Sequence, residues 1–280
     1  MLNILDPGQT VRFNTSIYKN SDLVRTGTLS DGSCFLHAIL YATSAKYRNS
    51  TEDKKRTIVS EFRQTLGSSL NKDQWLLLSD GELSKLSYTI HFRRLLDDLY
   101  TEEQNDVNEF ILSVLKKDEI ETMFESSLKY KDIYFGSSKL VNGMVNIFEK
   151  RLQHIKQFES KIVALSARVK ELFDNLIQSS INNALAEYKN TLSDSSEWLG
   201  EEHIELLSII FNYNIYFFNS ETKEPYTFGK SKNYPYDKNI VLLWVNDSHF
   251  EVIGKVYDKK ITRLLNNDDD LIEAIQYYFK

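Results

Sequence analysis

Residues 144–190 contain neither glycine nor proline, and this uninterrupted stretch constrains the fold more than any other part of the sequence. Because both residue types weaken or end helices, their absence predicts one long helix or two abutting ones. Apolar residues recur within it at spacings of three and four, as in a coiled-coil seam; they are Ile155, Phe158, Ile162, Leu165, Val169, Leu172 and Leu176. We expect the seam to pack on a helix over residues 107–128, folded back through 136–143 as an αα-hairpin. Dimerisation through the seam is the alternative.

The parts of the chain on either side of this stretch predict a mixed α/β domain. The predicted helices are 34–47, 51–70 and 201–211, and the predicted strands are 214–218, 240–245 and 249–256. We therefore expect an α/β (α+β) fold in which a small central β-sheet is flanked by helices and carries an inserted helical hairpin arm. The predicted boundaries are 1–101 for the first part of the core, 102–190 for the arm and 191–280 for the second part of the core.

Composition and charge exclude several classes of protein. A net charge of −6 without a long Lys/Arg run argues against a nucleic-acid partner, because phosphate binding needs a clustered basic surface. No segment has the roughly 18 apolar residues of a membrane span, and the first residues lack the pattern of a secretory signal. We expect a protein that acts in the cytosol. One cysteine excludes an internal disulfide, and no His or Cys pair has zinc-site spacing, so we expect no metal or other cofactor.

The single cysteine lies in the segment 31–38, DGSCFLHA, directly after a turn and at the start of an apolar helix. The first turn of a helix has unpaired backbone N–H groups, and its dipole favours an anion. We therefore expect the thiol pKa of Cys34 to lie below its unperturbed value of about 8.5. The same N–H groups could hold an oxyanion during acyl transfer. The pattern predicts a nucleophilic cysteine.

A nucleophilic cysteine needs a base and a third group that orients the base. His249 is the best candidate for the base because it begins a strand just after a tight turn. Residues two apart in a strand point to the same face, so Glu251 can reach the imidazole and fix its tautomer. This predicts a triad of Cys34, His249 and Glu251. The other histidines are expected to have packing or surface roles; they are His37, His91, His154 and His203.

Three separated blocks together resemble the OTU (ovarian tumour) family of deubiquitinases. The first is the cysteine block, 31–38. The second is WLGEEHIEL at 198–206 with NIYFF at 214–218, which resembles the family's Trp-Gly, Glu-Leu helix and the central strand after it. The third, 244–253, resembles the strand, turn and His-aromatic-acid block that closes the family's catalytic core. The order of the blocks is that of the family.

The resemblance implies a papain-like fold that hydrolyses the isopeptide bond after the C-terminal glycine of ubiquitin, in conjugates or polyubiquitin chains, without a cofactor. Cys34 would attack the carbonyl, His249 would transfer the proton and Glu251 would orient His249. The family usually has Asp or Asn at that third position, and Asp31 is the alternative orienting acid. The predicted oxyanion and substrate-binding residues are Gly32, Ser33, Trp244 and Phe250. A ubiquitin-like modifier with the same Gly-Gly tail is an alternative substrate.

The helical stretch separates the first two blocks by more residues than in compact family members. OTU proteins of intracellular bacterial pathogens resemble this chain in carrying a helical arm there, and large DNA viruses also carry OTU proteins. We expect an effector or a viral protein that acts in the host cytosol, with the arm contributing to the site for the distal ubiquitin. The expected enzyme is a monomer. The alternatives are a catalytically weak OTU-fold ubiquitin-binding module that acts through its arm, and an adaptor that dimerises through the seam.

Overall fold

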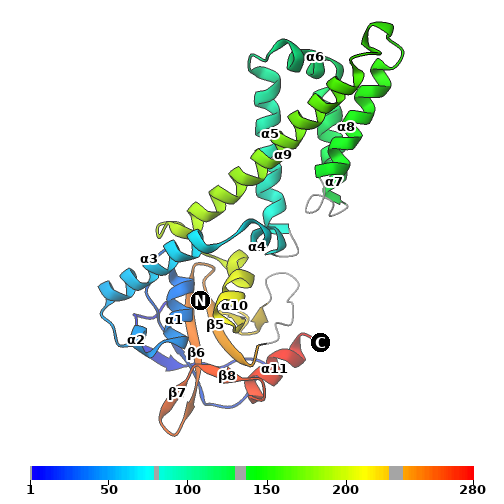
Figure 1. Ribbon diagram of the computed structural model, residues 1–280. Helices are drawn as coiled ribbons and strands as arrows, with labels where there is room; N and C mark the ends of the chain where they lie inside the picture. The colour runs from blue at the N-terminus through cyan, green and yellow to red at the C-terminus, as the bar shows by residue number, and fades with distance from the viewer. Residues whose placement is uncertain (1, 79–81, 130–136, 227–235) are drawn as a thin grey trace. The chain divides into compact units, whose positions relative to one another are not determined.

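The computed structural model describes residues 2–78, 82–129, 137–226 and 236–280 (Figure 1). The chain divides into two compact units, which are considered separately below. The first unit is Met1–Ser69 together with Lys189–Lys280, and the second is Leu70–Tyr188. These compact units begin a new segment at Leu70 and at Lys189, and the boundaries proposed from the sequence are 102 and 191.

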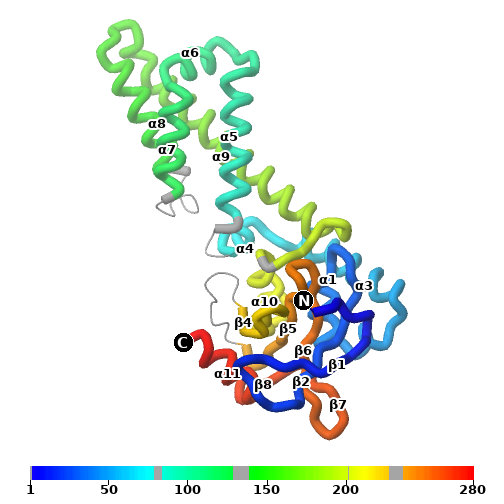
Figure 2. The backbone as a smooth tube through the Cα atoms, turned by 180° about the vertical axis from the view of Figure 1, so that it is seen from behind, coloured from blue at the N-terminus to red at the C-terminus, as the bar shows by residue number. Residues whose placement is uncertain are grey.

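The first unit is built on one mixed β-sheet with the strand order β1-β2-β6-β5-β3-β4, and β7 pairs with β6 and β8 with β5. The strands are β1 Thr10–Arg12, β2 Leu23–Thr26, β3 Asn214–Asn219, β4 Pro225–Tyr226, β5 Lys238–Val245, β6 His249–Tyr257, β7 Lys260–Thr262 and β8 Leu264–Asn266. β3 and β5 are parallel, and the pairs β1–β2, β2–β6, β3–β4, β5–β6, β5–β8 and β6–β7 are antiparallel. Figure 2 shows β1, β2 and β6 side by side. Part of the polar loop expected over 221–238 lies outside the described residues.

Helices cover both faces of this sheet, which confirms the predicted α/β class with a central sheet flanked by helices. The helices are α1 Cys34–Thr43, α2 Ala45–Arg48, α3 Glu52–Ser69, η3 Glu201–His203, α10 Ile204–Phe211 and α11 Asp270–Tyr278. Successive strand residues point to opposite faces. Leu243 and Ile253 accordingly join a core with α11. Phe250 faces α1 instead, where its ring lies 4.9 Å from that of Phe35. This contact holds the first turn of α1 beside the start of β6.

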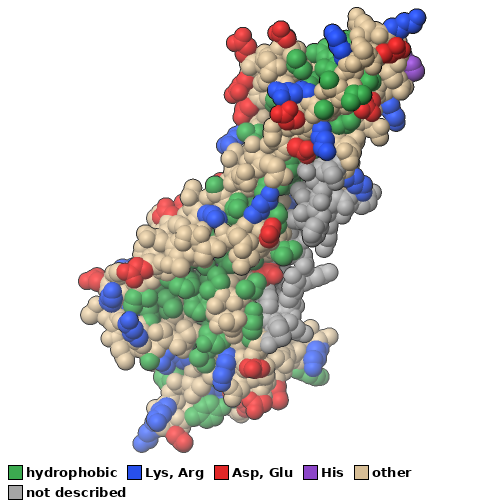
Figure 3. All heavy atoms as spheres, viewed as in Figure 1, with side chains coloured by type: hydrophobic (Ala, Val, Ile, Leu, Met, Phe, Trp, Pro, Cys, Tyr) green, Lys and Arg blue, Asp and Glu red, His purple; other side chains and the backbone are tan. Residues whose placement is uncertain are grey.

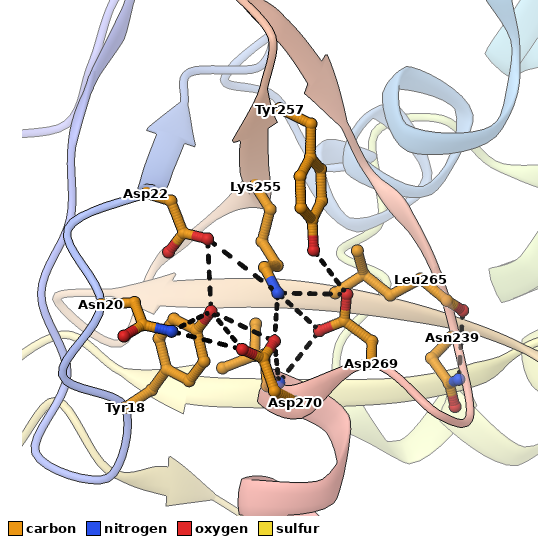
Figure 4. A network of polar contacts seen from close by, with 10 residues as sticks. Tyr18, Asn20, Asp22, Asn239, Lys255, Tyr257, Leu265, Asp269 and Asp270 are labelled. Atoms are coloured by element: carbon orange, nitrogen blue, oxygen red, sulfur yellow. Dashed lines mark hydrogen bonds and ion pairs between the residues drawn. The ribbon is translucent and has the colours of Figure 1, made fainter.

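A polar network around Lys255 fastens α11 to the sheet (Figure 4). The buried Nζ of Lys255 donates to Asp269 at 3.1 Å and to Asp270, and the hydroxyl of Tyr18 donates to Asp270 at 3.1 Å. Burial disfavours the ammonium ion, but its hydrogen bonds to Asp270 and the neighbouring groups outweigh that cost and raise the pKa of Lys255. The network joins β6, the segment before β2 and the first turn of α11.

The second unit is helical and is a bundle rather than a two-helix hairpin. Its elements are α4 Lys72–Leu77, α5 Glu82–Thr101, α6 Asp106–Val114, α7 Lys117–Lys129, α8 Ser137–Leu152, η2 Lys156–Phe158 and most of α9 Ile162–Ser193. The rings of Phe92 in α5 and Phe124 in α7 stack with their centroids 3.8 Å apart. This packing belongs to the second unit, which contains α5, whereas the sequence boundaries put residues 82–101 in the core.

The prediction of a continuous apolar seam is wrong for its first residues, Ile155 and Phe158, which do not lie in an α-helix. Residues 153–161 interrupt the helix, and Ile155 there is 39% exposed. Phe158 lies in η2, and its ring stacks on that of Phe110 with centroids 5.0 Å apart, so tertiary packing turns the chain where no glycine or proline does. The helix expected over 107–128 is likewise two helices, α6 and α7. The turn expected over 136–143 begins outside the described residues and continues as part of α8.

Candidate active site

Cys34 and His249 are the first residues of α1 and β6, two elements that pack together through Phe35 and Phe250. Cys34 is the first residue of α1 and is only 1% exposed. The backbone amide of Phe250 and the indole of Trp198 donate hydrogen bonds to its sulfur. Phe250 directly follows His249 in β6, and the charge of Asp31 acts on both Cys34 and His249.

The environment of Cys34 corrects the expected thiol pKa. Burial raises this pKa above its ordinary value of 9.0, and the negative charge of Asp31 acts in the same direction. The hydrogen bonds from Trp198 and Phe250 act against it but do not outweigh burial. The expectation of a lowered pKa is therefore wrong for this state, because it considered the helix terminus and not the closed surroundings. The resting residue is a neutral thiol.

His249 is equally buried, and its ring is not committed to another group. The side chain is 1% exposed, and neither ring nitrogen has a hydrogen-bond partner among the described residues. Burial lowers its pKa from 6.5 to about 4, the charge of Asp31 acting in the opposite direction. A buried polar atom without a partner is unusual and calls for an explanation. A neutral imidazole with both nitrogens available can accept a proton from a thiol.

Asp31 is the carboxylate whose charge reaches both Cys34 and His249. Its Oδ1 accepts a hydrogen bond from the amide of Ser33 at 2.9 Å, and its Oδ2 lies 3.0 Å from Nε2 of His37 and also accepts from Arg56. Burial disfavours the carboxylate, but the hydrogen bond to His37 and the nearby cations outweigh it and lower the pKa of Asp31. Asp31 is thus ionised and held in place by the turn.

The carboxylate of Glu251 hydrogen-bonds to Leu5 and Arg25 and not to His249, the expected partner. Its Oε1 accepts from the amide of Leu5 at 2.8 Å, and its Oε2 accepts from Nη1 of Arg25 at 3.0 Å. The side chain is fully buried, and burial raises the pKa of its carboxyl against the effects of Leu5 and Arg25. Glu251 does lie two residues from His249 in β6, as predicted, but no hydrogen bond joins them. The carboxylate instead fastens β2 and the residues before β1 to β6.

Gly32 and Ser33 shape the turn before Cys34. A Cβ on Gly32 would lie 2.9 Å from the carbonyl oxygen of Ser196, so only glycine allows this close approach. The backbone amide of Ser33 donates a hydrogen bond to the side-chain carboxylate of Asp31. The backbone amide of Cys34 donates one to the backbone carbonyl oxygen of Asp31 at 3.0 Å. Two of the expected oxyanion donors are therefore used inside the turn in this state. Phe250, also among the predicted residues, has a backbone amide that hydrogen-bonds to the sulfur.

The two aromatic residues predicted to bind substrate differ in position. Trp244 in β5 is half-buried and lies directly opposite Phe250 in the register of the sheet. Phe250 is fully buried beneath the cysteine and is a core residue rather than a surface for substrate. Trp198 is 39% exposed and stacks on Phe250 with ring centroids 6.3 Å apart. Its place in the second sequence block was the signal that could have identified it.

Comparisons with known proteins find a structural likeness but no matching family model. No protein-family model matches the chain, and no curated protein matches it. Among solved structures, the chain is similar to an OTU domain in complex with ubiquitin. That likeness covers 98% of this chain and 93% of the other, at 12% sequence identity and a TM-score of 0.39.

The surface around the turn is polar on one side and apolar on another. A cavity of about 510 Å³ adjoins the turn, and the residues that line it include Asp31, Ser33, Arg56, Gln64 and Ser195. Hydrophobic side chains gather over the face of the sheet unit formed by α1 and α10 (Figure 3), and Ile209 and Ile210 of α10 are among the exposed ones. Within the described residues, no helix could span a membrane and no cluster of side chains could hold a metal ion.

The protonation states of the resting site lead to a pH prediction. Because the pKa of Cys34 is raised above 9.0 and that of His249 is lowered to about 4, neither group is charged near neutral pH. Only the thiolate reacts with iodoacetamide. The alkylation rate of the free protein should therefore keep rising up to and beyond pH 9. Intact-mass measurements across a pH series test this, since the chain has a single cysteine; a plateau reached between pH 6 and 7 would contradict it.

Proposed function

We propose that the protein is a cysteine-dependent deubiquitinase with an OTU-like sheet unit, which hydrolyses the isopeptide bond after the C-terminal glycine of ubiquitin. One observation carries the proposal: the single cysteine, at the first turn of a helix, and a buried histidine whose ring nitrogens have no partner among the described residues both lie within reach of the charge of Asp31. The three sequence blocks that resemble the OTU family support the choice of ubiquitin as substrate. Within this proposal the helical unit, Leu70–Tyr188, contributes to binding the distal ubiquitin.

The proposed reaction uses the residues in the following roles. His249 takes the thiol proton of Cys34, and the sulfur forms a bond to the carbonyl carbon of the ubiquitin terminus as the carbonyl oxygen becomes an oxyanion. His249 then gives the proton to the leaving lysine amine, and the C–N bond breaks to leave a thioester. Water, deprotonated by His249, attacks the thioester and releases the ubiquitin carboxylate and the thiol. Asp31 stabilises the imidazolium that forms in each half of the cycle.

The closed resting site requires a change when substrate binds. Cys34 is almost fully buried, and its thiol and the imidazole of His249 are not hydrogen-bonded to each other. Catalytic hydrogen bonds often form only in the complex with substrate. We therefore propose that entry of the ubiquitin tail shifts the turn, so that an amide now bonded to Asp31 becomes an oxyanion donor and the thiol meets the imidazole.

A ubiquitin that carries a thiol-reactive group at its C-terminus tests the proposal. We expect a single covalent adduct with the protein by intact mass, no adduct with Cys34→Ala, and a slower reaction with His249→Gln. Ubiquitin-like modifiers that carry the same reactive group should be tested in parallel, and faster reaction with one of them would change the substrate assignment. Tight non-covalent binding of ubiquitin without any adduct would instead indicate a ubiquitin-binding module. The neutral thiol and the closed resting site would be consistent with that function.

A further inference from the structure

Arg63 of α3 is a fully buried arginine in the sheet unit that the proposed mechanism does not use. Four of its five acceptors are backbone oxygens, and the fifth is a hydroxyl. Its Nε donates to the carbonyl of Leu192 at 2.9 Å, and its Nη2 donates to that of Thr191 at 2.6 Å. Its Nη1 donates to the hydroxyl of Ser33 at 2.9 Å, the carbonyl of Glu197 at 2.8 Å and that of Gly32 at 3.5 Å.

The first two acceptors belong to the last turn of α9. The final carbonyls of a helix have no partner within the helix, and a cation near them is stabilising. Gly67 lies one turn after Arg63 in α3 and packs on the same place, where a Cβ would lie 2.6 Å from the carbonyl oxygen of Lys189. One face of α3 therefore packs closely on the end of α9. Gly67 allows the close backbone approach, and Arg63 donates hydrogen bonds to the last carbonyl oxygens of α9.

The remaining acceptors belong to the cysteine turn and to the segment that follows α9. Gly32 also accepts a hydrogen bond from the amide of Leu199 at 3.0 Å, next to Trp198, whose indole donates to the sulfur of Cys34. The guanidinium thus joins three segments that are distant in the sequence: the turn, the end of α9 and residues 195–199. Its rigid planar fork fixes their relative positions in a way that a single point charge could not.

We propose that Arg63 is a positioning residue that sets the reactivity of Cys34 by holding the cysteine turn through Ser33 and Gly32. The catalytic consequence rests on the proposed function, but the effect on the thiol can be measured without it. Arg63 hydrogen-bonds to Gly32 and Ser33 and not to Cys34, so it acts through the turn. Its loss should change how readily Cys34 reacts rather than how tightly substrate binds.

A single-hydroxyl variant tests this with little disturbance of the fold. Ser33→Ala removes one acceptor of Arg63 and keeps the backbone of the turn. The matched control is Ser180→Ala, which removes another buried hydroxyl, bonded to the carbonyl of Leu176 at 2.7 Å in α9. We expect Ser33→Ala to lower kcat on a fluorogenic ubiquitin substrate about tenfold, as for loss of a hydrogen bond to a charged group, with KM unchanged. Because the turn loosens, iodoacetamide should alkylate Cys34 several-fold faster, and the control should show neither change.

Arg63→Lys and Arg63→Met complete the experiment. Arg63→Lys keeps the positive charge but loses the planar guanidinium, so its kcat and alkylation rate should resemble those of Ser33→Ala. If Arg63→Met does not fold, the Ser33→Ala result alone tests the positioning role. All alkylation is measured well below the unfolding transition, and the single cysteine makes the label specific. Equal alkylation rates for Ser33→Ala, Arg63→Lys and Ser180→Ala would overturn the positioning role. If wild-type protein fails to hydrolyse ubiquitin, the proposed function fails, but the alkylation rates still decide the role of Arg63.

Discussion

Replacing Asp31 by asparagine should slow the reaction with ubiquitin about 10- to 100-fold, the scale expected for loss of a nearby charge that stabilises a buried imidazolium. The reaction turns His249 into an imidazolium in a buried place, and Asp31 is the carboxylate whose charge reaches that ring. Asparagine retains an oxygen that can accept from the amide of Ser33, so the turn keeps one of its anchors. Rates of adduct formation with the reactive ubiquitin, compared at equal concentrations with wild type, measure the effect.

Arg56→Ala is the control for this variant. Arg56 bonds to the same carboxylate but is substantially exposed, so its removal leaves the negative charge in place and should alter the rate only slightly. Thermal unfolding of both variants shows whether the turn remains folded. A rate for Asp31→Asn within tenfold of wild type would mean that Asp31 shapes the turn without assisting His249.

Glu251→Ala should lower the free energy of unfolding by about 3–5 kcal/mol, the usual cost of removing one partner of a buried ion pair. The substitution leaves the guanidinium of Arg25 buried without its carboxylate and the amide of Leu5 without its acceptor. Urea denaturation followed by tryptophan fluorescence measures the change. The active site should suffer only through this loss of stability.

The paired replacement Arg25→Met with Glu251→Leu separates the two roles of Glu251. Replacing both members of a buried ion pair by apolar residues of similar size often restores stability. We therefore expect the double variant to be more stable than Glu251→Ala and to react with ubiquitin within about tenfold of wild type. A stable double variant that reacts as slowly as Asp31→Asn would show that Glu251 orients His249 after all.

The choice between Asp31 and Glu251 shows what local sequence reasoning can and cannot decide. The positions of Cys34 and His249 follow from short-range signals, namely a turn before a helix and a turn before a strand. The ion-pair partner of Glu251 cannot be found from such short-range signals, because Arg25 is 226 residues away in the chain. Only the pairing of β2 with β6 brings the two together. The spacing of Glu251 from His249 was read correctly, but a stronger electrostatic partner takes the carboxylate.

The helical unit shows the same division. Periodicity predicted helices over most of residues 106–190, and helices are found there. It could not predict the interruption at 153–161, because the contact of Phe158 with Phe110 causes it. The pKa of Cys34 is a third example: the helix terminus is visible in the sequence, but burial, which reverses the direction of the shift, is not.

The way in which α9 ends limits how freely the helical unit could be exchanged between related proteins. Inserted domains are often treated as modules that can be removed or grafted. Here the last two helical carbonyls before Ser193 are acceptors of Arg63, and residues 195–197 pack directly on Gly32. A replacement insertion would have to return to the sheet unit as a helix with the same final turn. In chimeras, therefore, the junction at this end and not the insertion's own stability should decide whether the sheet unit keeps the proposed activity.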